Sequence, residues 1–251
     1  MHRENVREGR CVRMRKALIC ARVQLHLYVR SGRILFPMLL LIGYPLVFYH
    51  VLPVDVASSF LLSSAAAFAW GAWLALALYW SEDPTLRQIF IVKSGMGRYH
   101  TAQSLALALL GAAGGALLIA LPMLARITCL PGMFARDPAP REVLLGICLN
   151  ACAGMGGASL GGVFHPNIIR DRKLAYLLCL LAGLLGFVGG MAGFPLSLRL
   201  LFPPLYDSIR FSGASASLEA LPGAFYCAWH ILYAMACTGI RLFALTKMRE
   251  R

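Results

Sequence analysis

The sequence is poor in charge, and above all in acidic residues. Only 14% of its 251 residues are charged, and 11 Asp and Glu residues stand against 24 Lys and Arg residues. Hydrophobic residues make up 59% of the chain, whereas soluble domains are nearer half apolar and a quarter charged. This balance excludes an ordinary soluble domain and predicts a single integral membrane domain over residues 1–251.

Carboxylates are missing altogether from six long apolar runs. The runs cover residues 34–52, 57–80, 102–125, 143–164, 174–198 and 221–243. Each is close to the roughly 20 residues that cross a bilayer as a helix, and their continuous apolar character favours helices over barrel strands. We therefore predict an all-α membrane protein with six transmembrane helices. Arg241, the only Lys or Arg in these runs, is close enough to an end to be expected to snorkel to the membrane surface.

Lys and Arg are unevenly distributed between the two sides of the predicted membrane, and this asymmetry predicts the orientation. If the N-terminus is cytoplasmic, 19 of the 24 Lys and Arg residues fall on the cytoplasmic side and five outside. Both termini are therefore expected in the cytoplasm, and the chain in a cytoplasmic (inner) membrane. The net charge of +13 is then a topology signal with lipid-headgroup contact, and nucleic acid is not an expected partner.

The segment before the first run is basic and is expected to stay with the mature protein. The first run starts only at residue 34 and has full span length, which does not suit a cleaved signal peptide. Residues 10–32 mix basic and apolar side chains at roughly helical spacing. This mixture predicts an interfacial amphipathic helix that leads into the first span.

Three kinds of site are also missing from the sequence. Without a GxxxxGK[ST] motif, the chain is not expected to bind the phosphates of ATP. The lack of intramembrane carboxylates disfavours ion- or proton-coupled transport, because such a charge costs roughly 2.5–3.5 kcal/mol on insertion scales and is kept only for function. No CxxC occurs, only Cys129 lies in an outer loop, and neither His50 nor His230 has a second ligand at metal spacing. We expect no disulfide framework, metal or cofactor in this chain.

Between the second and third runs stands a capped segment, "SEDPTLRQIFIVKSGMGRYHTAQS", which starts at residue 81. Asp83 followed by Pro84 predicts a helix start, and the helix is expected to run to about Ser94, where Gly95 and Gly97 break it. Its apolar side would hold Ile89, Phe90, Val92 and Met96, and its polar side Arg87, Gln88 and Lys93. We interpret it as a rigid docking helix for a cytoplasmic partner, with an interfacial helix resting on lipid as the alternative.

These features resemble the membrane subunit of an ABC-2 type ABC transporter. The resemblance covers nearly the whole chain: six spans, cytoplasmic termini, a basic amphipathic helix before the first span, and a long cytoplasmic helix between the second and third. "EDPTLRQIFIVKSGMGRYHTAQSL" is similar to the family's coupling helix, with an acidic start, a Thr-x-x-x-Ile core and a Gly/Arg break. "GGVFHPNIIRDRK" looks like its fourth-to-fifth connection, where an aromatic-x-Pro turn precedes polar residues.

The resemblance implies partners as well as a fold. Cytoplasmic ATPase subunits, with their own ATP and Mg²⁺, would supply the energy, and a second permease protomer, identical or not, would face this one across the substrate path. The contact with the ATPase would fall on Glu82, Asp83, Arg87, Gln88, Ile91 and Lys93. The path would be lined by residues such as Asn150, Met155, Ser159 and Tyr233. The lack of buried acids favours export of a hydrophobic or amphiphilic cargo, such as a peptide antibiotic, a drug or a lipid.

Two other functions fit parts of the sequence. Ser159 in the fourth span and His230 in the sixth could form the serine–histidine pair of a rhomboid-like intramembrane protease. However, the motif reads Gly-Ala-Ser-Leu-Gly, and the two residues lie at depths that differ by roughly 10 Å at 1.5 Å rise per residue. A non-transporting membrane anchor or sensor, which recruits a cytoplasmic protein through the same helix, is the other alternative.

Glycines four residues apart mark three helix faces: Gly111 and Gly115, Gly157 and Gly161, and Gly189 and Gly193. Small residues at this spacing let helices approach closely in lipid. We expect these faces to pack inside the bundle, with a contact between two protomers as the alternative.

Overall fold

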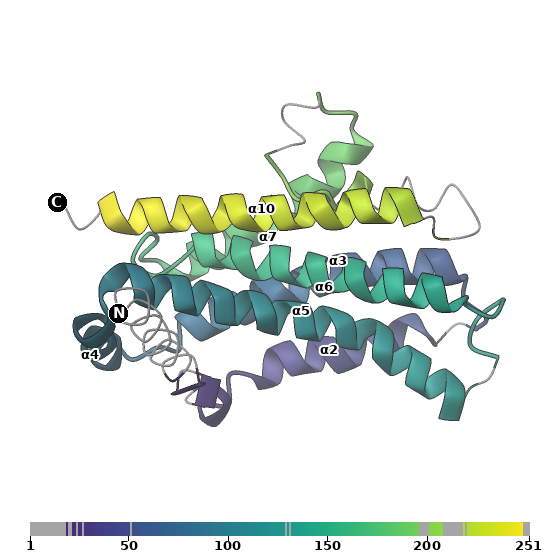
Figure 1. Ribbon diagram of the computed structural model, residues 1–251, viewed down its shortest axis with the longest axis horizontal. Coiled ribbons are helices and arrows are strands. Elements are labelled where there is room, and N and C mark those ends of the chain that lie inside the picture. The colour runs from purple at the N-terminus through teal and green to yellow at the C-terminus, as the bar shows by residue number, and fades with distance from the viewer. Residues whose placement is uncertain are drawn as a thin grey trace, which may run out of the picture.

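The computed structural model describes residues 19, 22–23, 25–26, 28–50, 52–128, 130, 132–195, 201–207, 218 and 220–247. Its helices are α2 (Leu35–Phe48), α3 (Val56–Tyr79), α4 (Pro84–Ser94), α5 (Met96–Thr128), α6 (Pro140–Val163), α7 (Arg172–Met191) and α10 (Ala220–Lys247). In the part of the chain described, the β structure is limited to one isolated parallel bridge, between Val54 and Phe134. Figure 1 shows the long helices lying side by side, with α4 at one end of the bundle.

Five of these helices, α3, α5, α6, α7 and α10, are long and apolar enough to cross a membrane. The protein is therefore a helical membrane protein, as predicted. α2 is apolar but has only 14 residues, with Pro45 inside it. Most of the predicted interfacial helix lies outside the described residues, but those described between Ile19 and Arg30 are helical.

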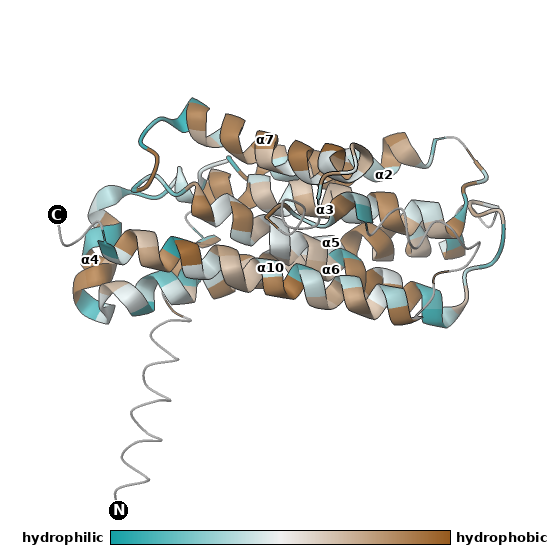
Figure 2. Cartoon of the chain, turned by 90° about the horizontal axis from the view of Figure 1, so that it is seen from above, coloured by the Kyte–Doolittle hydropathy of each residue, from teal (hydrophilic) through white to brown (hydrophobic). Residues whose placement is uncertain are grey.

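The chain returns repeatedly to the α4 end of the bundle. Arg33, just before α2, donates a hydrogen bond of 2.5 Å to the carbonyl of Trp80, just after α3. Arg241, near the end of α10, donates one of 2.6 Å to Ser104, near the start of α5. The segment before α2 and the last turns of α10 therefore lie on the same side as α4. Figure 2 shows hydrophilic residues gathered at α4 and at the opposite end, and hydrophobic residues along the helices between.

The bundle is built around α6, which packs against α3, α5 and α10. Glycines make this possible, since a Cβ at Gly154 or Gly111 would strike the backbone carbonyl of the other, and a Cβ at Gly157 would strike the carbonyl of Phe68. Gly115 and Gly161 meet neighbouring backbones in the same way. The predicted glycine faces of the third and fourth spans are thus internal packing surfaces.

The predicted glycine face of the fifth span is wrong. α7 ends at Met191 rather than at residue 198, because Gly193 takes a φ of +69° and reverses the chain. The amide of Phe194 then donates to the carbonyl of Gly189 at 3.1 Å, and the Phe194 ring packs on Gly189. This is a Schellman C-cap, in which glycine supplies the left-handed residue. The chain then folds back along α7, where Pro203 packs on Gly186.

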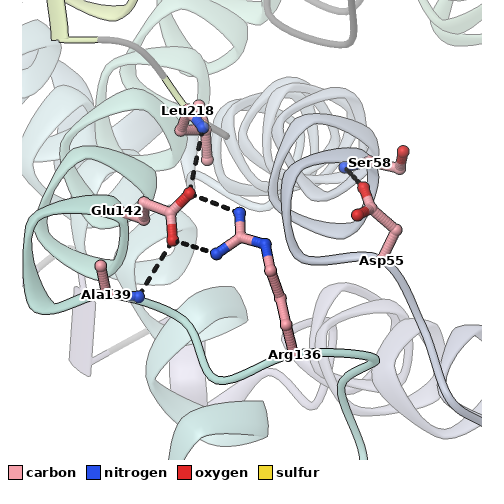
Figure 3. A network of polar contacts seen from close by, with 6 residues as sticks. All are labelled: Asp55, Ser58, Arg136, Ala139, Glu142 and Leu218. Atoms are coloured by element: carbon pink, nitrogen blue, oxygen red, sulfur yellow. Dashed lines mark hydrogen bonds and ion pairs between the residues drawn. The ribbon is translucent and has the colours of Figure 1, made fainter. Parts of the chain in front are cut away.

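The end opposite α4 is held by a buried carboxylate, shown in Figure 3. Glu142, in the first turn of α6, is 3% exposed and accepts two hydrogen bonds from Arg136, at 2.6 and 2.7 Å. It also accepts from the amides of Ala139 at 2.9 Å and Leu218 at 3.1 Å. We call this cluster the Glu142 clamp. It joins the α5–α6 loop, the start of α6 and the segment before α10.

Candidate functional site at the α4 end

The structure confirms the predicted start and end of α4. The carboxylate of Asp83 accepts a hydrogen bond of 2.7 Å from the amide of Thr85, and Pro84 is the first helical residue. Gly95, at a φ of +85°, ends the helix after Ser94. Gly97, expected to help break it, instead lies in the first turn of α5. Capping rules predicted both ends of α4 because each end depends only on residues adjacent to it in the sequence.

The predicted division of α4 into an apolar and a polar side is only partly correct. None of its residues is buried, and Ile89 and Val92 share the exposed face with Gln88 and Lys93. Val92 is 85% exposed. Phe90 turns inward, where its ring stacks on Tyr99 of α5 with centroids 6.4 Å apart. The outward face of α4 is thus mixed, with two aliphatic residues beside polar ones.

The six predicted coupling residues divide into two groups. Asp83, Gln88 and Lys93 are exposed, whereas Glu82, Arg87 and Ile91 are half-buried. Glu82 does not point outward: its carboxylate accepts from the hydroxyl of Tyr99 and, at 3.3 Å, from the side-chain amide of Gln103. A cavity of about 210 Å³ lies beside it, lined by Tyr28, Leu78, Ser81, Glu82, Asp83, Leu86 and Phe90.

Arg241 is the site residue whose environment the sequence did not predict. It does not snorkel, because its side chain is 1% exposed. Its guanidinium lies over the ring of Tyr79, 4.5 Å from the centroid, and donates to the Tyr79 hydroxyl. It also donates to Ser104 at 2.6 Å and Gln103 at 2.7 Å, and lies 3.3 Å from Nδ1 of His100. Among the described residues, no carboxylate lies within ion-pair distance of it.

A sequence signal for this cluster did exist. His100, Gln103 and Ser104 are spaced three and four apart, so a helix places them on one face. Arg241 is the only Lys or Arg in the predicted spans, and such a residue usually faces the bundle interior. The two signals could not be connected, because the contact between α5 and α10 is not local in sequence.

His165, just beyond the end of α6, is fully buried beside this cluster. Its Nδ1 accepts a hydrogen bond of 3.1 Å from the amide of Asn167, and its ring meets the Tyr79 ring at 4.9 Å and the His100 ring at 5.5 Å. Burial, and then the positive charge of Arg241, hold the pKa of His165 well below its usual range. The folded protein therefore keeps this ring neutral.

We expect the stability of the folded protein to fall as the pH drops below about 6.5. The unfolded state then takes up a proton at residue 165 that the folded state excludes, so acid favours unfolding. The thermal midpoint in mild detergent, measured from pH 7.5 to pH 5, should fall less steeply in His165→Gln than in the wild type. His50→Gln, which alters an exposed histidine, is the matched control and should keep the wild-type slope. An unchanged slope in His165→Gln would contradict the assignment.

The residues predicted to line a substrate path lie within the packed bundle. Asn150, which is fully buried, donates to the carbonyls of Phe60 at 3.0 Å and Gly146 at 2.9 Å, and so joins α6 to α3. Ser159 and Tyr233 are also buried, and Met155 is half-buried.

The serine–histidine pair of the protease alternative is not formed in this structure. Both ring nitrogens of His230 are buried without a hydrogen-bond partner in the described part of the chain. The ring lies beside Gly156 and Phe68 instead.

The comparisons with known proteins add no functional information. No protein-family model matches the chain, and no curated protein or solved structure matches it.

Proposed function

We propose that this protein is the permease subunit of an ABC-2-like exporter. In this proposal two protomers form the transport unit in a cytoplasmic membrane, with both termini inside and α2 as a sixth, short span. Separate cytoplasmic ATPase subunits bind ATP and Mg²⁺ and dock on α4. The cargo is hydrophobic or amphiphilic, such as a peptide antibiotic, a drug or a lipid.

The observation that carries the proposal is α4 itself. It is capped at its start by Asp83 and ended by Gly95, it presents an exposed face of Gln88, Ile89, Val92 and Lys93, and none of its residues is buried. A helix with two exposed aliphatic residues between polar ones suits a groove in a protein partner. α4 contacts α5 and lies between α3 and α5 in the chain. A partner that displaces α4 would therefore also displace these two helices.

Charge reversal on α4 tests the proposal. Arg87→Glu combined with Lys93→Glu should lower the amount of co-purifying P-loop ATPase by at least about tenfold, because like charges across an interface cost several kcal/mol. The measurement is ATP hydrolysis and ATPase recovery in the complex purified from native membranes in mild detergent. Membrane insertion of the variant should equal that of the wild type.

The matched control reverses Arg170, in the α6–α7 connection, and Lys173, in the first turn of α7, which are both exposed and carry the same total charge. This variant should retain ATPase better than the α4 variant. If the α4 variant recovers as much ATPase as the wild type, or if the wild type brings no ATPase, the proposal fails. Recovery of some other protein without ATP hydrolysis would favour the anchor or sensor alternative.

A further inference from the structure

A buried cation needs an explanation in any membrane bundle. Burying an ionised side chain is unfavourable unless its donors are matched by acceptors. Nη1 and Nη2 of Arg241 obtain these acceptors from two other helices: Tyr79 on α3, and His100, Gln103 and Ser104 on α5. Its Nε has no hydrogen-bond partner in the described part of the chain. The single charge thereby holds the last turns of α10 against α3 and α5.

Gln103 extends this contact to the start of α4. Its Oε1 accepts from Nη2 of Arg241 at 2.7 Å, while its Nε2 donates to Oε2 of Glu82 at 3.3 Å. A side-chain amide can accept from a cation and donate to a carboxylate at the same time. Glu82 directly precedes Asp83, the N-cap of α4. The order Arg241–Gln103–Glu82 therefore connects α10 to α4 through three side chains.

A second route between α4 and Arg241 runs through aromatic rings. Phe90 of α4 stacks on Tyr99, the Tyr99 ring meets the His100 ring at 5.1 Å, and His100 lies 3.3 Å from the guanidinium. Tyr99 also donates its hydroxyl to Glu82. Both routes from α4 meet at the same residue of α10.

We propose that Arg241 is a positioning residue that links α10 to α4 through Gln103 and Glu82, so that the two helices shift together. The link is a property of the isolated chain. Its meaning for transport rests on the proposed function: a partner that displaces α4 would then move the last span as well as α3 and α5.

Gln103→Glu separates this role from simple packing. The new carboxylate still accepts from Arg241, and as an ion pair it does so more strongly. It can no longer donate to Glu82 and instead repels it. We expect amide hydrogen exchange in α4 to accelerate by roughly tenfold or more, the value of one lost hydrogen bond to a charged group. Exchange in α3 and α6 should stay within twofold of the wild type.

The exchanged pair, Glu82→Gln with Gln103→Glu, supplies the rescue. The amide introduced at position 82 can donate to the new carboxylate and still accept from Tyr99, so the same groups face each other in reverse order. The single variant Glu82→Gln completes a double-mutant cycle. The cycle isolates the interaction between residues 82 and 103 from the other effects of changing Glu82. Amide exchange in α4 should be slower in the double variant than in Gln103→Glu alone. The second substitution should reverse most of the acceleration that Gln103→Glu causes. Gln88→Glu, the same change on the exposed face, is the matched control and should leave α4 exchange unaltered.

Three outcomes would overturn the proposal: α4 exchange in Gln103→Glu within twofold of the wild type, additive effects without rescue, or equal acceleration in the Gln88→Glu control. If Gln103→Glu does not fold, the same cycle is read from the yield of monodisperse protein, and failure of the double variant to recover overturns the proposal. Because the isolated full-length chain is used, none of these outcomes depends on an ATPase. Loss of the proposed ATPase contact would equally leave the link intact.

Discussion

Replacing Gly157 with alanine should sharply lower the stability and the yield of the folded protein. The added methyl group would overlap the backbone carbonyl of Phe68 on α3, and a backbone atom cannot turn aside as a side chain can. α6 would have to separate from α3, which also disrupts its close contact with α5 at Gly154. Overpacking of a core costs about 1–3 kcal/mol and sometimes more, and we expect the upper end here. The measurement is the yield and thermal midpoint of monodisperse protein in detergent.

Gly183→Ala is the matched control for this change. Gly183 also lies inside a membrane helix, α7, but a Cβ there meets no atom within 4 Å. This variant should be as stable as the wild type or slightly more so, because alanine is favoured over glycine in a helix by roughly 0.5–1 kcal/mol. Equal stability of the two alanine variants would show that α6 and α3 are not packed as closely as described.

The second large effect is expected at the Glu142 clamp (Figure 3). Glu142→Gln removes the charge that Arg136 and two backbone amides share, and it turns an amide group toward those donors. Breaking a buried ion pair costs about 3–5 kcal/mol. The lower end applies here, because the Arg136 side chain is 38% exposed and regains water. The thermal midpoint should fall, and the α5–α6 loop should become more sensitive to protease.

Asp137→Asn supplies the comparison at the same end of the bundle. Asp137 pairs with Arg126 at 2.5 Å, but its side chain is 88% exposed. Exposed pairs contribute roughly 0–1 kcal/mol, so this variant should unfold almost as the wild type does. A midpoint in Glu142→Gln as high as in Asp137→Asn would mean that the clamp does not hold this end together.

Several features were predictable because they depend on neighbouring residues or on composition. The apolar runs predicted the membrane class, and five of them appear as helices long enough to span. Asp83, Pro84 and Gly95 predicted both ends of α4. The glycine faces of α5 and α6 were predicted as packing surfaces, since a residue without a side chain has few other uses on a membrane helix.

Two features differ from the sequence-based expectation because of contacts between segments distant in the chain. Glu82 was expected to face a partner, but Gln103 and Tyr99 draw its carboxylate inward. Arg241 was expected to snorkel to the membrane surface, but Gln103 and Ser104 at the start of α5 accept its hydrogen bonds inside the bundle. The end of the fifth span differs for a local reason: its apolar run continues past Met191, and only the backbone turn at Gly193 shows that the helix has ended.

The sequence by itself determined that this is a helical membrane protein, where its long helices lie and where α4 begins and ends. Those properties follow from hydrophobicity, length and capping, which act within a few turns of the chain. Only the tertiary structure decided that Arg241, Gln103 and Glu82 meet. A buried charge takes its partners from whichever helices pack around it. Helix packing depends on residues far apart in the chain, so no local stretch of sequence predicts it.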